Sequence, residues 1–301
     1  MKKVLVVIVT YNGLHWIERC IKSVFNSTYP LTVMVIDNMS TDGTQAFVKS
    51  NYKDVIFYQV HDNLGFGRAN NIGFKYAVNN DFDYVYLLNQ DAWIECDTIE
   101  KLLFVHSRYS EYGILSPIQM NARRNSIDKN FALLCNESQC SHFLSDLYIR
   151  NLQDVYEISF VMAAHWLISR ECFLKVGCFS PFFQHYGEDN DFVNRVGYWK
   201  FKIGIVPMAV AIHDREYRVV CLKKKMKYLF SSEYLPILTN INDSFIKSLF
   251  KASKFILKFF IPFLFSSYPM LATILIVKSF IYIPISLTFR CRAKCKSAFL
   301  N

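Results

Sequence analysis

Residues 1–110 alternate between short apolar runs and segments in which apolar side chains recur at helical spacing. The first run, Val4–Val9, is continuous and β-branched, as in strands buried on both faces. Between the runs, apolar residues repeat every three or four positions, which is typical of one face of a helix. The predicted strands are 4–9, 33–36, 55–58 and 84–88, and the predicted helices are 14–25, 44–50, 65–77 and 97–106. This alternation predicts an open, mainly parallel α/β sheet.

Polar side chains gather where three of the predicted strands end. They are Thr10-Tyr11-Asn12 after the first strand, Asp37-Asn38 after the second and Asn89-Gln90-Asp91 after the fourth. In open α/β sheets, ligands bind beyond the carboxyl ends of the strands, so this edge is the candidate ligand site. No G-x-G-x-x-G follows the first strand and no G-x-x-x-x-G-K-[ST] occurs. These absences argue against a dinucleotide dehydrogenase and a P-loop NTPase.

The residue types at this edge suit a nucleotide diphosphate sugar. Tyr11 offers an aromatic wall, Asp37 an acceptor for the base or ribose, and the Asp42-Gly43 turn close approach of backbone. Asp91 is a carboxylate able to hold a divalent metal that also touches phosphate oxygens. A single aspartate at a strand end is also a common helix cap or loop acceptor, so from the residue alone both roles for Asp91 stay open.

Several segments resemble glycosyltransferase family 2, and within it the bacterial rhamnosyltransferase-like branch that builds surface polysaccharides. The segments are 7–12, 35–44, 63–73, 89–91, 167–171, 176–179, 187–192, 206–207 and 212–213. They cover residues 4–214 in the order and at the spacing of that family. The resemblance implies a glycosyltransferase A-type fold, which is a single Rossmann-like domain that uses a nucleotide sugar and usually Mg²⁺ or Mn²⁺.

The resemblance also implies roles for individual residues. Asp189 matches the general base, with Glu188 as the second candidate, and Asp91 and His213 match the metal site. The implied donor-binding residues are Thr10, Tyr11, Asn12, Asp37, Asn38, Asp42, Gly65, Arg68, Asn70, Asn89 and Gln90. The implied acceptor-binding residues are His165, Trp166 and Asp191. Each has a structural alternative: a core aromatic for Trp166, a core histidine for His213, and helix capping for the acidic cluster.

Three positions depart from the family pattern. Asn89 stands at the first position of the D-x-D motif, Ser180 stands where an aspartate is frequent, and Lys200 replaces a frequent glycine. The substitution at Asn89 leaves the metal one carboxylate fewer. Because Asp91 and Asp189 are both retained, we expect an active enzyme.

The last part of the chain differs in charge and hydropathy. The net charge is +9, yet from residue 215 onward 15 Lys and Arg accompany 3 Asp and Glu, and the remainder is slightly acidic. Residues 259–277 carry no charge, and basic clusters flank the apolar run 259–289. Spanning a bilayer takes roughly 20 apolar residues, but Pro262, Pro269 and Pro284 interrupt this run.

A single crossing would also place one of the two basic flanks on the wrong side of the membrane. We therefore expect a peripheral or re-entrant helical pair on the anionic, cytoplasmic face of the inner membrane. A buried helical hairpin in a soluble oligomer is the alternative. Nucleic acid is not an expected partner, because the positive charges bracket apolar segments instead of lining a polar face. The nine cysteines include no C-x-x-C pair and are expected to be reduced and mostly buried.

Two parts are therefore predicted: a catalytic domain over 1–214 and a basic, hydrophobic, helical membrane-associating region over 215–301. By resemblance, the activity is inverting transfer of a sugar from a nucleotide diphosphate sugar to a hydroxyl of a polyprenyl-linked glycan acceptor. The product would belong to a surface polysaccharide such as O-antigen or capsule. An inactive membrane-bound scaffold of the same fold and a nucleotidyltransferase remain alternatives, and the oligomeric state stays open. Residues 120–157 match no motif and are assigned to acceptor recognition or a flap.

Overall fold

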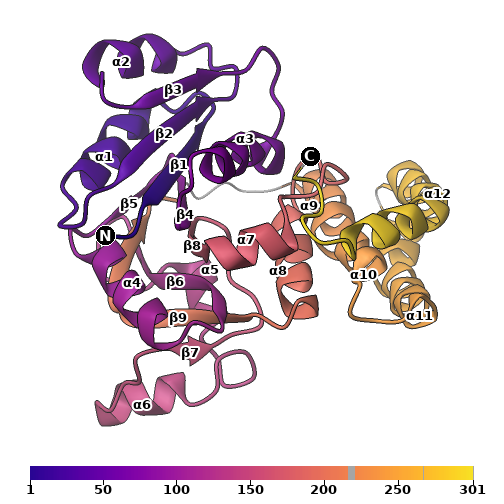
Figure 1. The fold of residues 1–301 in the computed structure, drawn as a ribbon. Coiled ribbons are helices and arrows are strands. Elements are labelled where there is room, and N and C mark those ends of the chain that lie inside the picture. Colours follow the sequence, from indigo (N-terminus) through magenta and orange to yellow (C-terminus); the bar gives the residue numbers. More distant parts are fainter. Residues whose placement is uncertain (216–220, 267, 301) are drawn as a thin grey trace.

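The computed structural model describes residues 1–215, 221–266 and 268–300 (Figure 1). The strands are β1 Val4–Thr10, β2 Thr32–Asp37, β3 Ile56–Gln59, β4 Tyr84–Asn89, β5 Ala92–Ile94, β6 Tyr112–Asn121, β7 Tyr156–Glu157, β8 His165–Ser169 and β9 Lys202–His213. The helices before β9 are α1 Leu14–Phe25, α2 Thr44–Asn51, α3 Phe66–Asn79, α4 Thr98–Arg108, α5 Lys129–Ala132, α6 Phe143–Ile149, α7 Arg170–Val176 and α8 Glu188–Tyr198. After β9 come α9 Leu222–Leu229, the π-helix η1 Phe230–Tyr234, α10 Leu235–Thr239, α11 Phe245–Phe255, the π-helix η2 Ile256–Phe260, the 3₁₀-helix η3 Ile261–Phe265 and α12 Pro269–Ala293.

A nine-stranded sheet forms the centre of the molecule, in the order β3-β2-β1-β4-β8-β6-β9-β5, with β7 also paired to β9. The first four strands in this order are parallel, as the strand–helix alternation predicts. Beyond them the sheet is mixed, because β8 inserts antiparallel to both β4 and β6. This insertion makes Leu88 and His165 neighbours across the sheet and so brings the second half of the sequence to the strand ends of the first.

Helices cover both faces of the sheet, and β1 shows why its sequence is apolar throughout. Val4, Val6 and Ile8 belong to the core on the side of α1 and α4, whereas Leu5 and Val7 belong to the core on the side of α3, α7 and α8. All five side chains are essentially inaccessible to water. Successive residues of a strand point to opposite faces, so a strand between two helical layers needs an unbroken apolar run.

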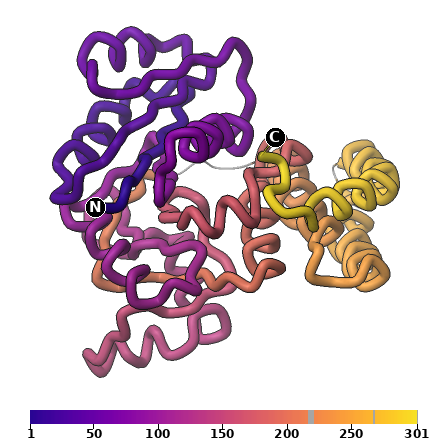
Figure 2. The backbone as a smooth tube through the Cα atoms, viewed as in Figure 1, coloured from indigo at the N-terminus to yellow at the C-terminus, as the bar shows by residue number. Residues whose placement is uncertain are grey.

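The helices α9–α12 lie together at one side of the molecule, next to α8 and away from the β3 edge of the sheet (Figure 2). They are tied together by buried polar contacts: Tyr234 donates to the carbonyl of Ser279 at 3.0 Å, and Arg290 donates to the carbonyl of Leu238 at 3.2 Å. By length and composition, α12 is the one helix among the described residues that is apolar enough to cross a membrane. Its most apolar window has a mean hydropathy of 2.0 and is only 22% buried.

Residues 297–299 return from these helices to the sheet domain and pack against the end of α7. Ser297 donates from Oγ to the carbonyl of Leu174 at 2.7 Å, and the carbonyl of Ala298 accepts from Cys178 N at 2.9 Å. Gly177 has φ +92°, and a Cβ there would overlap the backbone of Ala298. Glycine is therefore required at this crossing for both its conformation and its lack of a side chain. The contact joins the helical region to the element that precedes α8.

All nine cysteines are free thiols, as expected for a reduced protein, and five of them are buried. Burial raises the pKa of the Cys172 and Cys178 thiols well above the ordinary value. Such thiols behave as small apolar side chains and are unreactive.

Candidate active site

The polar strand ends of β1, β2 and β4 surround a cavity of about 840 Å³, within the usual size range for small-ligand sites. Of the residues expected to bind a donor or metal, its lining contains Tyr11, Asn12, Asn38, Gly65, Arg68, Asn89, Gln90 and Asp91. We call this space the donor cavity. Gly65 lies where the chain passes the carbonyl of Gln184, too close for any side chain.

Gln90 shapes the first wall of the donor cavity. Its Oε1 accepts hydrogen bonds from Thr10 Oγ1 and from Tyr11 N, both at 2.8 Å, and its Nε2 donates to the carbonyl of Tyr11 at 3.2 Å. These bonds fix the loop after β1 and hold the half-exposed Tyr11 ring at the cavity. Thr10 itself is buried behind the wall, so it supports the loop that binds and does not line the cavity.

Asp37 is fully buried at the end of β2 with one oxygen in use. Its Oδ2 accepts from Ser40 N at 3.0 Å, whereas Oδ1 has no partner among the described residues. A buried carboxylate oxygen without a donor is costly. Asp37 does not line the donor cavity, however, so its contact with a base or ribose stays a prediction. Next to it, Asn38 bonds to Asn63 and Leu64 and thereby fixes the loop that leads to α3.

Two expected donor-binding residues have local structural roles. Asp42 accepts from the backbone N–H groups of Leu14 and Thr44 and joins the starts of α1 and α2, and these bonds outweigh burial and lower its pKa. Asn70 is buried in α3 and donates to the carbonyl of Phe66 at 3.0 Å. Neither side chain reaches the donor cavity, because each is used by the backbone around it.

Asp91 and His213 are brought together by the antiparallel pairing of β5 with β9. Ala92 pairs with His213 in register, and Asp91 Oδ1 lies 3.4 Å from His213 Nε2. Burial raises the pKa of Asp91, but the hydrogen bond and charge of His213 more than offset this, so its pKa lies below the ordinary value. His213 is 2% exposed, and its Nδ1 has no hydrogen-bond partner among the described residues.

This pair fits a divalent cation in part. A carboxylate and an imidazole are suitable ligands for Mn²⁺ and, less well, for Mg²⁺. Within the described ranges no three His, Cys, Asp or Glu side chains converge on one point, so the protein offers two ligands. Diphosphate oxygens and water would complete the coordination, as is usual for such ions bound with a nucleotide.

A second cavity, of about 640 Å³, opens beside the first at the start of α8. It contains Glu188 and Asp189 and shares four lining residues with the donor cavity, namely Phe66, Asn89, His185 and Tyr186. We call it the acceptor cavity. Asn130 and Leu133 also line it, so part of the unmatched segment 120–157 lies where acceptor recognition was expected.

The two carboxylates of the acceptor cavity both have raised pKa values. Burial, together with the neighbouring Asp189, raises the pKa of Glu188 from 4.5 to about 7, and Glu188 Oε2 has no partner among the described residues. Burial raises the pKa of Asp189 from 3.8 to about 6, although Asn190 N donates to its Oδ1 at 2.9 Å. At neutral pH, Asp189 is therefore mostly ionised and basic enough to accept a proton from a hydroxyl.

The three residues expected on the acceptor side lie outside both cavities. Trp166 is fully buried, stacks on Phe179 and donates to the carbonyl of Val161, because its position in β8 points into the core. Asp191 is buried and bonds to Arg195 at 2.9 Å. His165 is also buried, where it contacts the Tyr86 hydroxyl and the carbonyl of Ile212. All three side chains therefore lie behind the cavity walls, and their contact with an acceptor stays a prediction that these positions do not support.

Arg195 connects its ion-pair partner Asp191 to the end of α7. Its other nitrogens donate to the carbonyls of Val176 and Cys178 at 2.9 and 2.8 Å, so one buried guanidinium joins the end of α7 to the first turn of α8. Burial raises the pKa of Asp191, and the charge of Arg195 offsets only part of this rise. The pair positions the first turn of α8, on which Glu188 and Asp189 sit.

Among the lining residues that were not identified from the sequence are Trp16, His185, Tyr186 and Arg215. Trp16 lines the donor cavity and donates from Nε1 to Asp214 at 3.2 Å. His185 and Tyr186 stand between the two cavities, and Arg215 lines the acceptor cavity while its Nε lies 3.3 Å from Asp128. The sequence signal that could have identified them is closeness to a motif, since three of them lie within three residues of the 187–192 and 212–213 motifs.

Comparison with known proteins shows which family this chain is similar to. The glycosyl transferase family 2 model matches residues 5–177. Glycosyltransferase GlyA of Streptococcus pneumoniae is 30% identical over 103 residues, which are 33% of this chain and only 14% of GlyA. The N-acetylglucosaminyl-diphospho-decaprenol L-rhamnosyltransferase of Mycobacterium tuberculosis is 26% identical over 231 residues, which are 70% of this chain and 75% of that enzyme.

Known structures agree on the fold. TarS 1-349 of S. aureus superposes with a TM-score of 0.62 at 14% identity, covering 97% of this chain and 83% of that one. The mannosyltransferase PcManGT of Pyrobaculum calidifontis, in complex with GDP-Man and Mn²⁺, gives 0.60 at 16% identity, covering 97% and 84%. Both likenesses concern the fold alone. Together with the family match, they confirm the glycosyltransferase A-type fold, and the chain belongs to glycosyl transferase family 2.

Proposed function

We propose that this chain is an inverting glycosyltransferase that moves a sugar from a nucleotide diphosphate sugar to a hydroxyl of a lipid-linked glycan. The observation that carries the proposal is the position of Asp189. It is a largely buried carboxylate with a pKa of about 6, in a cavity that joins the donor cavity at Asn89, His185 and Tyr186. Direct transfer of a sugar needs a base beside the acceptor and a binding site for the donor. One cavity contains a carboxylate able to act as the base, and polar strand ends line the other.

In the proposed reaction, Asp189 takes the proton of the acceptor hydroxyl as that oxygen attacks C1 of the sugar. The new O–C1 bond forms on the face opposite the diphosphate, the C1–O bond to the diphosphate breaks, and the nucleoside diphosphate leaves with the electron pair. A single displacement of this kind inverts the configuration at C1. Asp91 and His213 would hold a divalent cation, which would neutralise charge on the departing diphosphate. Arg68, also on the donor cavity wall, adds a second positive charge.

The acceptor and the location are proposed from other features. The mycobacterial relative is named for a decaprenol-linked diphosphate substrate, which supports a polyprenyl-linked acceptor here. The apolar α12 and the basic clusters around it support attachment to the cytoplasmic face of the inner membrane. We propose 1–214 as the catalytic domain and 215–301 as the membrane-associating region, acting in the synthesis of a surface polysaccharide such as O-antigen or capsule. An inactive scaffold would need neither Asp91 nor Asp189, and the family match favours glycosyl over nucleotidyl transfer.

A thermal-shift experiment tests the donor half of the proposal. The full chain is heated with UDP, dTDP or GDP sugars, each with Mn²⁺ or with EDTA. A ligand that binds only the folded state raises the melting temperature. We expect a metal-dependent rise with one class of nucleotide. If no nucleotide raises the melting temperature, the assignments of Asp37 and Asp91 both fail, and the scaffold becomes the better account.

A further inference from the structure

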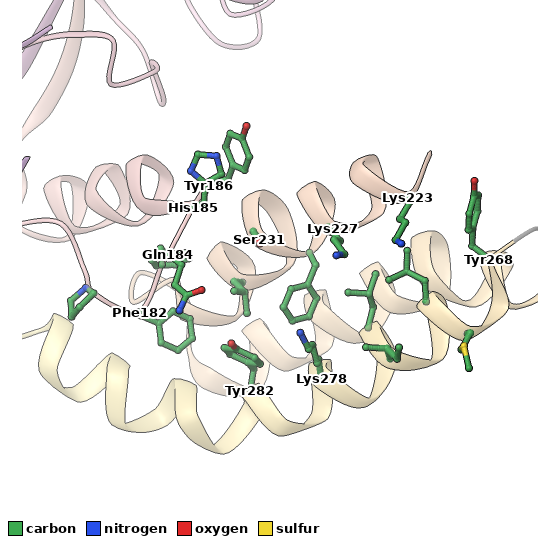
Figure 3. A pocket seen from close by; sticks show the side chains of 18 of the residues that line it. Phe182, Gln184, His185, Tyr186, Lys223, Lys227, Ser231, Tyr268, Lys278 and Tyr282 are labelled. Carbon is green, nitrogen blue, oxygen red and sulfur yellow. The ribbon is translucent and has the colours of Figure 1, made fainter. Parts of the chain in front are cut away.

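A third cavity, of about 780 Å³, lies beyond the donor and acceptor cavities, and of its lining residues only Arg68 has a part in the reaction described above. It runs between α12 on one side and α9 with η1 on the other, and the 181–186 loop closes one end (Figure 3). We call it the helical groove. Its walls come mainly from the apolar, basic part of the chain after residue 221.

The lining of the helical groove combines apolar side chains with positive charge. Its apolar and aromatic residues include Phe182, Phe230, Leu271, Ile274, Leu275 and Tyr282. Its cations are Arg68, Lys223, Lys227 and Lys278, and no aspartate or glutamate occurs among the described residues that line it. An apolar trough with an excess of four positive charges is complementary to a molecule with a hydrocarbon tail and an anionic head.

Three lysines converge on the middle of this groove. Lys223 and Lys227 lie one helical turn apart on α9 and point towards α12, while Lys278 points back from α12 into the same gap (Figure 3). Within the described part of the chain, none of the three forms an ion pair with a carboxylate. Lys278 is also the single charge between residues 259 and 289. A charge within an otherwise apolar helix is unfavourable in a membrane-like surrounding unless a counter-charge meets it.

The groove is continuous with the active site. Arg68, Gln184, His185 and Tyr186 line both the helical groove and the donor cavity, and the last two also line the acceptor cavity. Arg68 is held at this junction by its bond to the carbonyl of Pro181 at 3.2 Å. A ligand whose head rests on the lysines can therefore extend an attached sugar past His185 towards Asp189.

We propose that the helical groove binds the lipid end of the acceptor, a long-chain isoprenyl diphosphate. The hydrocarbon tail lies along the apolar side chains of α12, and the diphosphate contacts Lys223, Lys227 and Lys278. This inference rests on the proposed function and names the site and the chemical class of its acceptor. It also gives Lys278 a partner that justifies its place in α12.

Binding of farnesyl diphosphate, a short soluble lipid of this class, tests the proposal. The full chain in mild detergent is titrated calorimetrically with farnesyl diphosphate, farnesol or inorganic diphosphate. We expect farnesyl diphosphate to bind at least tenfold more tightly than either of the others, because only it offers both the tail and the charge. Equal binding of inorganic diphosphate would identify a free-phosphate site, and equal binding of farnesol would identify a plain apolar patch. Either result overturns the proposal.

Matched double variants locate the head of the lipid. K227A/K278A removes two charges from the groove, whereas K224A/K225A removes two charges from exposed positions of α9 that do not line it. All four lysines are exposed, so both variants are expected to fold, which their melting temperatures check. Charged hydrogen bonds contribute about tenfold each to binding. We expect K227A/K278A to weaken farnesyl diphosphate binding about hundredfold and K224A/K225A to leave it nearly unchanged.

A second pair locates the tail. Ile274 lines the groove at 48% exposure, and Ile281 lies on the same helix at 53% exposure without lining it. Ile274→Asp is expected to weaken binding at least tenfold, and Ile281→Asp is expected not to. If the control variants weaken binding as much as their partners do, the attraction is diffuse and the groove is not the site.

Nucleotide binding measured on the same preparations separates the two proposals. Groove variants that lose farnesyl diphosphate but keep the nucleotide-dependent rise in melting temperature support the groove independently of the donor site. If wild-type protein binds farnesyl diphosphate but no nucleotide, the proposed function fails while the lipid site stands. If nucleotide binds and farnesyl diphosphate does not, the groove proposal fails alone.

Discussion

The sheet domain and the C-terminal helices treat charge and apolar surface in opposite ways. The sheet domain buries a charged pair and satisfies it locally: the side chains of Asp191 and Arg195 are 3% and 0% exposed. The helices α9–α12 keep most of their lysines at the surface and leave large apolar side chains exposed beside them, such as Phe280 at 62%. The first arrangement holds a polar ligand in a fixed geometry. The second is suited to a lipid surface, where apolar groups enter the bilayer and cations meet phosphate.

The largest effect that this comparison predicts is on catalysis in the sheet domain. Asp189→Asn removes the proposed base and is expected to lower the rate of transfer about 10³-fold, within the usual range for general-base catalysis. Donor binding, measured by thermal shift, is expected to survive. In the wild type, kcat/KM is expected to fall as the pH drops below about 6, because Asp189 becomes protonated. A variant with normal turnover would remove Asp189 from the reaction.

The next effect concerns the proposed metal site. Asp91→Asn leaves His213 without its carboxylate partner and is expected to lower transfer about hundredfold, since a metal contributes several kcal/mol to stabilising the leaving group. The stimulation of donor binding by Mn²⁺ is expected to disappear. Asp97→Asn, which changes a half-exposed carboxylate at the start of α4, beyond the other end of β5, is the control and should behave as wild type. Unchanged Mn²⁺ dependence in Asp91→Asn would place the cation elsewhere.

A smaller effect is expected on vesicle binding by the exposed apolar surface of α12. Val277 and Phe280 are exposed on α12, at 52% and 62%, and line none of the three cavities. The double variant V277D/F280D is expected to bind anionic vesicles at least tenfold more weakly in a sedimentation assay, because it removes about 3 kcal/mol of apolar burial. Phe104→Asp changes an equally exposed phenylalanine on the sheet domain and should sediment as wild type does. Equal losses would mean that the two surfaces do not differ.

The smallest effect is on stability. The folded state holds the proton of Glu188 more tightly than the unfolded chain does, since burial raises its pKa from 4.5 to about 7. The contribution of this group to stability therefore falls as the pH rises between these two values. Glu188→Gln removes the charge and is expected to be about 2 kcal/mol more stable than wild type at pH 6, with the difference shrinking towards pH 4. Denaturant unfolding at both pH values measures it, and a constant difference would contradict the burial argument.

The polar strand ends could be predicted from the sequence because their positions depend only on neighbouring residues along the chain. A polar residue directly after a buried strand must lie at the edge of the sheet, and Asn38, Gln90 and Asp91 do line the cavity at that edge. The approach of Asp91 to His213 was expected only from family resemblance. Physically it depends on an antiparallel pairing between β5 and β9, two strands that are far apart in the sequence.

Positions that are set by tertiary packing were harder to predict from the sequence. Trp166 and an aromatic residue on a cavity wall look alike in sequence, and only the direction in which β8 enters the sheet decides between them. The helical groove is a similar case: Lys227 and Lys278 belong to different helices, and nothing local indicates that they face one another. His185 and Tyr186 line three cavities because of where their loop passes, which no motif encodes.

The contact between residues 297–299 and the end of α7 has a consequence for synthesis. Ser297 and Leu174 are 123 residues apart in sequence, yet their hydrogen bond lies beside the corner that Arg195 joins to α8. On the ribosome, the sheet can form while this corner still lacks its last support. A nascent chain can therefore form the polar strand ends of the donor cavity before residues 297–299 brace the end of α7, and the start of α8 is expected to reach its final position only after the last helices have been made.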